Sequence, residues 1–231
     1  VRHYVSDRTS FKLVTDRLEN KKPGEKMFLF NVTMQNHGGY TYDGGEFPTV
    51  TISNLQGHYK EAEQYLSLIK ESDKAFEELV RYLKNYDEPT IVVMFGDHQP
   101  AVEQEFYEEL YGKSLSKLST EELQQRYKIP FVIWANYDIE SQDDLKTSPN
   151  YLSDLLLDTA NVPKNEIENF TSEVRNDVPQ INAMGHYDSD GNWVSRDEDT
   201  SNALDKYEAV EYYMLTRKEN KDAKENKDDK K

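Results

Sequence analysis

Residues 90–100 read TIVVMFGDHQP, and this stretch decides the fold. The run from Thr90 to Phe95 is almost wholly apolar, which predicts a strand buried on both faces, as in a parallel sheet. The run stops at Gly96-Asp97-His98. In parallel sheets, ligands collect beyond the carboxyl ends of the strands. The stretch therefore places a carboxylate and an imidazole where such a sheet binds its ligand.

A second apolar run, Met27 to Met34 (MFLFNVTM), lies upstream and predicts another buried strand. Between the two, apolar residues recur at three- and four-residue steps from Tyr59 to Asn85, which predicts a long amphipathic helix. Strand, helix and strand form a βαβ unit, whose strands are expected to be parallel. The first strand ends at QNHGGY, so His37 is also expected at a strand end.

The rest of the chain extends this α/β pattern. Further elements are predicted at Thr9–Asn20, Glu103–Tyr111, Thr120–Tyr127, Asn150–Ala160 and Ser201–Leu215 (helices), Ile129–Trp134 (a third buried strand) and Asn182–Trp193 (an edge hairpin). We expect residues 1–216 to form one α/β domain, a mostly parallel sheet flanked by helices with a small antiparallel carboxy-terminal element. Residues 217–231 (RKENKDAKENKDDKK) are too polar to order themselves and predict a disordered charged tail.

Composition limits the partners and the chemistry. The 231 residues carry a formal net charge of -16, which argues against a nucleic-acid partner, because phosphate backbones are bound by clustered Lys and Arg. There is no cysteine, so disulfides, thiolate metal sites and a Cys nucleophile are excluded. No apolar run approaches the roughly 20 residues that a membrane-spanning helix needs.

Asp97 and His98 are the sharpest candidates for chemistry, since both can turn toward one metal ion at a strand end. The structural alternative is that Asp97 caps a turn and His98 is incidental. His37 could donate a hydrogen bond to a phosphate or sulfate oxygen, or could be a purely structural turn residue. We assign no role to the other histidines, and residues 188–199 (DSDGNWVSRDED) favour a solvated acidic loop over a calcium loop.

The order of the motifs resembles a known family. FLFNVTMQNHGGY, YKEAEQYLSLIKESDKAFEELVRYL, TIVVMFGDHQP, IPFVIWANY and PNYLSDLLLDTANVP are similar to the second half of the catalytic domain of lipoteichoic acid synthase-like members of the sulfatase superfamily. The resemblance covers roughly residues 5 to 165. It implies an alkaline phosphatase-like fold, of which this chain is a partial domain.

The resemblance also implies roles. In that family the Asp-His pair of the GDH motif binds the catalytic metal, usually manganese, which assigns Mn2+ or another divalent cation to Asp97 and His98. The histidine of the NHG-type turn contacts the substrate phosphate, which assigns that role to His37. The family's nucleophilic threonine and a further acidic metal ligand lie upstream of the position where this chain begins, and no threonine here matches that motif.

The resemblance implies part of an extracellular, metal-dependent phosphoglycerol transferase that acts on a glycerophospholipid or teichoic-acid-type phosphodiester. The parent protein would be anchored in the bacterial cell membrane by upstream helices, with this domain outside, and the fragment itself would be inactive. Two alternatives stay open: a sulfatase or phosphodiesterase on the same scaffold, and a non-catalytic surface binding module.

Overall fold

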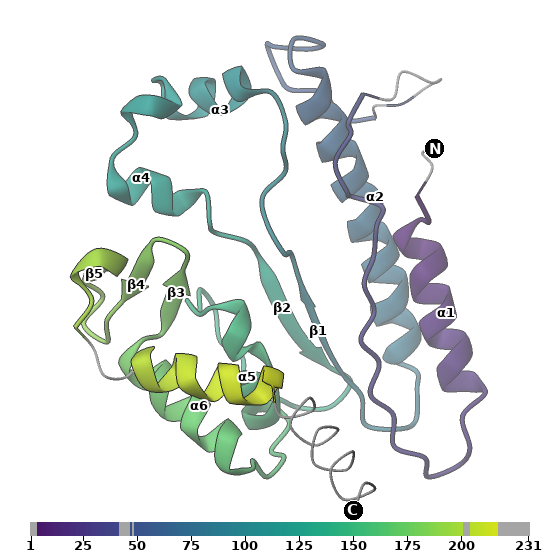
Figure 1. The fold of residues 1–231 in the computed structure, drawn as a ribbon. Coiled ribbons are helices and arrows are strands. Elements are labelled where there is room, and N and C mark those ends of the chain that lie inside the picture. The colour runs from purple at the N-terminus through teal and green to yellow at the C-terminus, as the bar shows by residue number, and fades with distance from the viewer. Residues whose placement is uncertain (1–3, 42–46, 48, 201–203, 217–231) are drawn as a thin grey trace, which may run out of the picture. The chain divides into compact units, whose positions relative to one another are not determined.

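The computed structural model describes residues 4–41, 47, 49–200 and 204–216. The chain divides into two compact units, Val1–Tyr137 and Asp138–Lys231 (Figure 1). The tail predicted at 217–231 lies outside the described residues, and the single domain expected over residues 1–216 stays a prediction. No helix of the described residues is long and apolar enough to cross a membrane.

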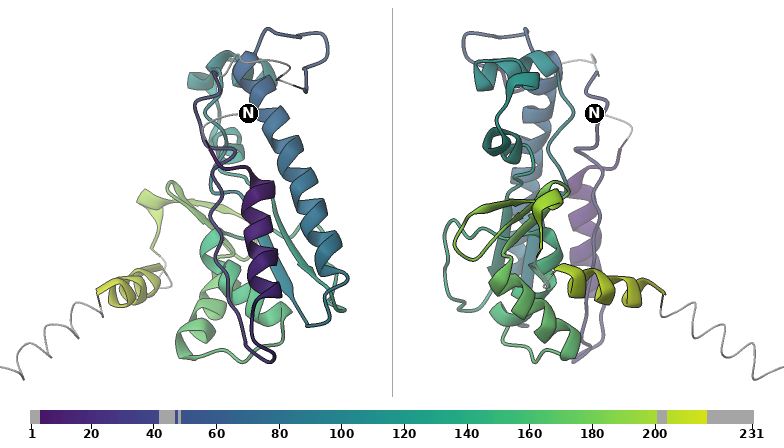
Figure 2. Two further views of the ribbon diagram at one scale, coloured as in Figure 1. Left: turned by 90° about the vertical axis from the view of Figure 1, so that its right-hand side faces the viewer. Right: turned by 60° about the vertical axis from the view of Figure 1, so that its left-hand side comes forward.

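Two helices form one side of the first unit. Helix α1 (Asp7–Glu19) begins after Ser6, whose hydroxyl accepts a hydrogen bond from the backbone amide of Thr9. It lies alongside α2 (Lys60–Leu83) in both Figure 1 and Figure 2. The apolar residues that α2 buries are spaced for one helical face: Ala62, Leu68, Ala75, Leu79 and Leu83. Both helices confirm the sequence prediction.

Strand β1 (Ile91–Phe95) confirms the predicted strand, but its partner runs the other way. It pairs antiparallel with β2 (Phe131–Ala135), with Ile91 opposite Ala135 and Phe95 opposite Phe131. Helices α3 (Gln104–Tyr111) and α4 (Thr120–Gln125), with a short 3-10 turn at Leu115–Lys117, connect the two strands. The ladder starts at Asn136, whose side chain accepts from Thr90 and donates to carbonyls at the end of α2.

The βαβ unit predicted from the sequence is not observed, because its first strand, at residues 27–34, does not form in the described structure. Within this segment, Phe28, Phe30 and Val32 are 80%, 72% and 68% exposed. Both sheets of the described residues are antiparallel, so the mostly parallel sheet is not observed. The apolar run signals a buried strand, and a strand can be buried only where neighbouring strands and covering helices enclose it. No described strand pairs with residues 27–34.

The second unit packs helices against a small sheet. Helices α5 (Leu152–Thr159), entered through a 3-10 turn at Pro149–Tyr151, and α6 (Glu166–Asp177) contact each other. Strands β3 (Gln180–Asn182), β4 (Gly185–Tyr187) and β5 (Trp193–Ser195) form an antiparallel sheet in that order, followed by a 3-10 turn at Arg196–Glu198. This sheet confirms the predicted antiparallel element. Residues 204–216 are helical, as expected.

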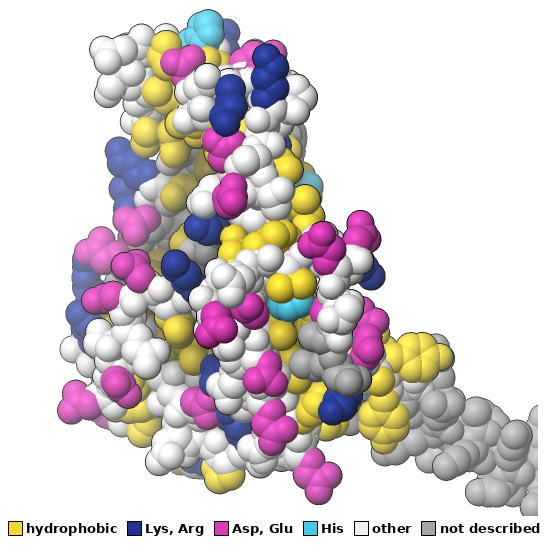
Figure 3. All heavy atoms as spheres, turned by 90° about the vertical axis from the view of Figure 1, so that its left-hand side faces the viewer, with side chains coloured by type: hydrophobic (Ala, Val, Ile, Leu, Met, Phe, Trp, Pro, Cys, Tyr) yellow, Lys and Arg dark blue, Asp and Glu magenta, His cyan; other side chains and the backbone are white. Residues whose placement is uncertain are grey.

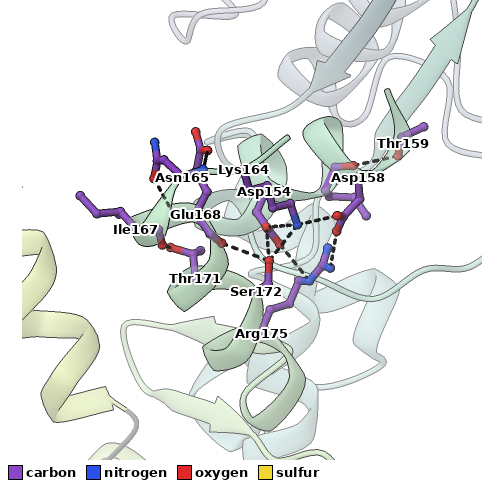
Figure 4. Close-up of polar contacts among 11 residues, drawn as sticks. Asp154, Asp158, Thr159, Lys164, Asn165, Ile167, Glu168, Thr171, Ser172 and Arg175 are labelled. Atoms are coloured by element: carbon purple, nitrogen blue, oxygen red, sulfur yellow. Dashed lines mark hydrogen bonds and ion pairs between the residues drawn. The ribbon is translucent and has the colours of Figure 1, made fainter. Parts of the chain in front are cut away.

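A charged cluster joins α5 to α6 (Figure 4). The Asp154 side chain is 1% exposed, and its Oδ1 lies 2.5 Å from Lys164 Nζ and accepts from the Ser172 hydroxyl. Arg175 Nε lies 3.2 Å from Asp154 Oδ2, without the alignment of a hydrogen bond. Asp158 shares both cations, 2.5 Å from Lys164 and 2.9 Å from Arg175. Burial opposes ionisation of Asp158, but Lys164 and Arg175 outweigh it and lower the pKa of that carboxyl.

Candidate functional site

Asp97 and His98 follow β1 directly, and the structure brings them together. The Gly96 amide donates to the Pro130 carbonyl, 3.3 Å away, which carries the antiparallel pairing one residue past β1. Beyond it the backbone turns, and His98 Nε2 lies 3.6 Å from Asp97 Oδ2. The Asp97 and His98 side chains are 85% and 71% exposed, so an ion could reach both.

The ring of His98 is oriented by the next residue. His98 Nδ1 lies 2.8 Å from the carbonyl oxygen of Gln99, and a carbonyl can only accept, so Nδ1 carries the hydrogen. In a neutral imidazole the lone pair is then on Nε2, the atom that faces Asp97. A histidine that binds a metal through one ring nitrogen typically donates its other ring N–H to a carbonyl in this way.

Gln99 anchors this loop through its side chain. Its amide nitrogen donates to the carbonyls of Gln125 (2.7 Å), the last residue of α4, and Lys128 (3.0 Å), just beyond it. Asp97 also caps the turn, since its Oδ1 accepts from the His98 amide at 2.9 Å. Asp97 therefore has the turn-capping role foreseen as the structural alternative, through Oδ1, while its Oδ2 faces His98. Sequence reasoning missed Gln99, although a polar residue directly after a candidate ligand pair was the available signal.

The pair fits a divalent cation only in part. One carboxylate oxygen and one imidazole nitrogen are suitable ligands for Mn2+ and similar ions. Within the described ranges, no group of three or more His, Asp or Glu side chains could hold a metal. Asp97 and His98 can therefore supply part of a coordination sphere.

His37 lies on a separate turn. Its backbone amide donates to the Met34 carbonyl at 3.1 Å, and its Nδ1 lies 3.1 Å from the Tyr4 hydroxyl. The preceding Gln35 is buried, while the His37 side chain is exposed. The turn thus presents an imidazole at the surface on a buried polar support, which is an arrangement that can contact an anion. Tyr4 was not foreseen from the sequence, since 33 residues separate it from His37.

The acidic loop and two of the other histidines lie in local structure away from these residues. Asp188 Oδ1 accepts from the backbone amides of Asn192 and Asp190. These hydrogen bonds lower the pKa of Asp188 and close the turn, as expected for an acidic loop. His58 packs edge-on against Tyr59, and the buried His186 lies 3.9 Å from Asp199 Oδ2. On the face drawn in Figure 3, acidic side chains are spread among basic and apolar ones.

Comparison with known proteins identifies the scaffold. Residues 1–162 match the family described as Sulfatase. The structure is similar to that of Streptococcus pyogenes phosphoglycerol transferase GacH in complex with sn-glycerol-1-phosphate. The TM-score is 0.60 at 20% identity, covering 78% of this chain and 44% of that one. This likeness confirms the alkaline phosphatase-like α/β class and the partial domain expected from the sequence.

Two curated proteins of Rhizobium meliloti (strain 1021) are also similar. The chain is 27% identical over 165 residues to a "Putative cyclic beta-1,2-glucan modification protein", covering 68% of this chain and 25% of that protein. It is 32% identical over 97 residues to the "Capsular polysaccharide biosynthesis protein RkpI", covering 42% and 16%. The chain thus spans a quarter or less of the length of these relatives.

Proposed function

The chain belongs to the sulfatase family, and from that membership we propose that it is part of a metal-dependent phosphoglycerol transferase. The observation that carries the proposal is the strand end at which Asp97 Oδ2 and His98 Nε2 lie 3.6 Å apart, with the His98 ring oriented by Gln99. The solved phosphoglycerol transferase shares the fold. The proposed substrate is a glycerophospholipid or a teichoic-acid-type phosphodiester.

The candidate residues have two proposed roles, metal binding and phosphate binding. Asp97 and His98 would hold Mn2+ or another divalent cation, which supplies Lewis-acid polarisation of a phosphoryl oxygen. The carboxylate contributes negative charge, and the Gln99 carbonyl keeps the His98 hydrogen on Nδ1. His37 would donate a hydrogen bond to a phosphate oxygen and stabilise the charge that develops there during transfer. We further propose that the parent protein is anchored in the bacterial cell membrane with this domain outside.

The assay that tests the function uses the full-length parent protein with manganese. A fluorescent glycerophospholipid and a chromogenic sulfate ester are supplied in separate reactions, and the diacylglycerol or the chromophore released is measured. Metal-dependent diacylglycerol release, matched by transfer of the glycerophosphate group to an added acceptor alcohol, supports the transferase. Release of the same group to water as free glycerol phosphate would make the protein a phosphodiesterase. Release from the sulfate ester alone would make the protein a sulfatase, and no metal binding with no release would favour a surface binding module.

Replacing His37 with alanine should separate catalysis from metal binding. We expect turnover in the parent protein to fall by about 10²- to 10³-fold, the usual cost of losing one donor to a developing charge. Manganese affinity, measured by titration calorimetry, should stay unchanged. His58→Ala is the matched control, because that side chain is also an exposed imidazole. Loss of manganese binding in His37→Ala would make His37 a ligand instead.

The 231-residue chain alone should be catalytically silent. Two protein ligands leave most of the coordination of a divalent ion to water, so binding should be weak. The family resemblance implies a nucleophile upstream of these residues, and without it covalent catalysis and proximity are both lost. The measurement is release from a chromogenic phosphodiester with manganese, alongside Asp97→Ala. Turnover that depends on Asp97 would show that these residues contain a nucleophile.

A further inference from the structure

The ring of Tyr4 contacts the ring of His37, the candidate phosphate-binding histidine. Its hydroxyl lies 3.1 Å from His37 Nδ1, the ring centroids are 5.4 Å apart, and the ring planes are inclined at 59°. The contact therefore involves one specific ring nitrogen of His37. It also fixes the direction in which the other nitrogen, Nε2, points.

Residues close in sequence to Tyr4 and to His37 share a buried network of hydrogen bonds. The Asp7 amide donates to Gln35 Oε1 at 3.1 Å, and Gln35 Nε2 donates to the Ser72 hydroxyl at 3.0 Å. The Ser72 hydroxyl in turn donates to Asp7 Oδ2 at 2.5 Å, and it also accepts from Asn36 Nδ2 at 2.8 Å. Asp7, Gln35 and Ser72 are all buried. The first residue of α1 and the turn at Gln35 and Asn36 are thus both fixed to α2.

The Tyr4 contact selects a tautomer. A neutral imidazole carries its hydrogen on one nitrogen, and the hydrogen bond made by one nitrogen decides the state of the other. A phenol hydroxyl is a better donor than an imidazole N–H, and an imidazole lone pair is a better acceptor than a phenol oxygen. In the favoured arrangement the Tyr4 hydroxyl donates to Nδ1. The hydrogen of the imidazole is then on Nε2.

We propose that Tyr4 is a positioning residue that holds His37 as the Nε2–H tautomer, aimed to donate to an oxygen of a phosphate group. This rests on the proposed function, since it gives His37 the role of a phosphate contact. Tyr4 acts through His37 and does not itself need to touch the substrate. A neutral His37 with its hydrogen on Nδ1 would present a lone pair to the phosphate instead, and two acceptors repel.

The first test reads the tautomer directly in the 231-residue chain. Two-bond hydrogen–nitrogen NMR correlations are recorded on the 15N-labelled chain at about pH 8, where an ordinary imidazole is neutral. His37→Ala assigns the His37 pattern. We expect the Nε2–H pattern, with Nδ1 shifted as a hydrogen-bond acceptor. In Tyr4→Phe that shift should disappear and both tautomers should be populated.

Tyr40→Phe is the matched control for this measurement. The Tyr40 hydroxyl donates to the Asn36 carbonyl at 2.7 Å in the same turn, so the variant removes a tyrosine hydroxyl without removing the bond to the imidazole. The His37 pattern should persist there. An Nδ1–H pattern in the unmodified chain, or an unchanged pattern in Tyr4→Phe, would overturn the proposal.

The second test asks whether the tautomer matters for the reaction. In the parent protein, Tyr4→Phe should lower kcat/KM by about 2- to 10-fold, the worth of one hydrogen bond, with manganese affinity unchanged. A changed NMR pattern with undiminished kcat/KM would overturn the positioning role. If the unmodified parent releases nothing from the phosphodiester, the proposed function fails, and the first test still decides whether Tyr4 sets the His37 tautomer.

Discussion

Alanine at Asp97 or at His98 is expected to abolish metal-dependent turnover of the parent protein. The proposed ion contributes several kcal/mol of transition-state stabilisation, so losing it should lower the rate by about 10³-fold or more. The two side chains meet at one strand end, 3.6 Å apart, so either deletion leaves the ion with a single ligand from this chain. Release from a glycerophospholipid with saturating manganese is the measurement.

The exposure of Asp97 and His98 allows an effect on activity to be separated from an effect on stability. Because both side chains are mostly exposed, the variants should unfold at nearly the unmodified temperature, and a rate loss then reports chemistry. Asp87→Ala is the matched control, an exposed acid shortly before β1. Near-normal turnover in either site variant would refute the assignment of the pair, whatever the ion.

The second large effect should be on stability, at Asp154. Asp154→Ala removes a buried carboxylate from Lys164 and Arg175, whose side chains are only 9% and 21% exposed. Deleting one partner of a buried pair leaves uncompensated charge and typically costs about 3–5 kcal/mol. Urea denaturation followed by circular dichroism should show the transition of residues 138–231 at lower urea, with the slope little changed.

Asp158 supplies the matched control for Asp154. It binds the same two cations, but its side chain is 47% exposed, so solvent already screens it. Asp158→Ala should therefore cost about 1 kcal/mol or less. Equal losses in the two variants would show that burial does not govern this cluster. Replacing Asp154, Lys164 and Arg175 together with apolar residues should recover much of the stability lost in Asp154→Ala.

Local signals in the sequence predicted most helices and two strands. The apolar spacing of α2 and the runs at β1 and β2 survive in the structure, because they depend on contacts within each element and its neighbours. Helix α6 was missed, although Asn165 and Glu168 form a capping box and Ile167, Phe170 and Val174 have helical spacing. The sequence did not show whether β2 runs parallel or antiparallel to β1, since a short apolar run has the same pattern in both directions.

The candidate site was predictable in its residues but not in its support. Asp97, His98 and His37 each follow an apolar run, and that position could be read from the sequence. The roles of Tyr4 and Ser72 could not be read from the sequence. Tyr4 is 33 residues from His37, and Ser72 is 36 residues from Asn36, the partner that it contacts in the same turn. Pairings at such separations depend on how α1 and α2 pack, which no local pattern encodes.

The exposed apolar side chains within residues 27–34 favour association between copies of the chain in solution. No described strand pairs with this segment, and Phe28 and Phe30 are exposed, so another copy can add to it as a strand. The net charge of -16 opposes this by repulsion between copies. That repulsion acts over about 30 Å at 0.01 M salt but only about 10 Å at 0.1 M. Colloidal stability of the isolated chain should therefore fall as ionic strength rises.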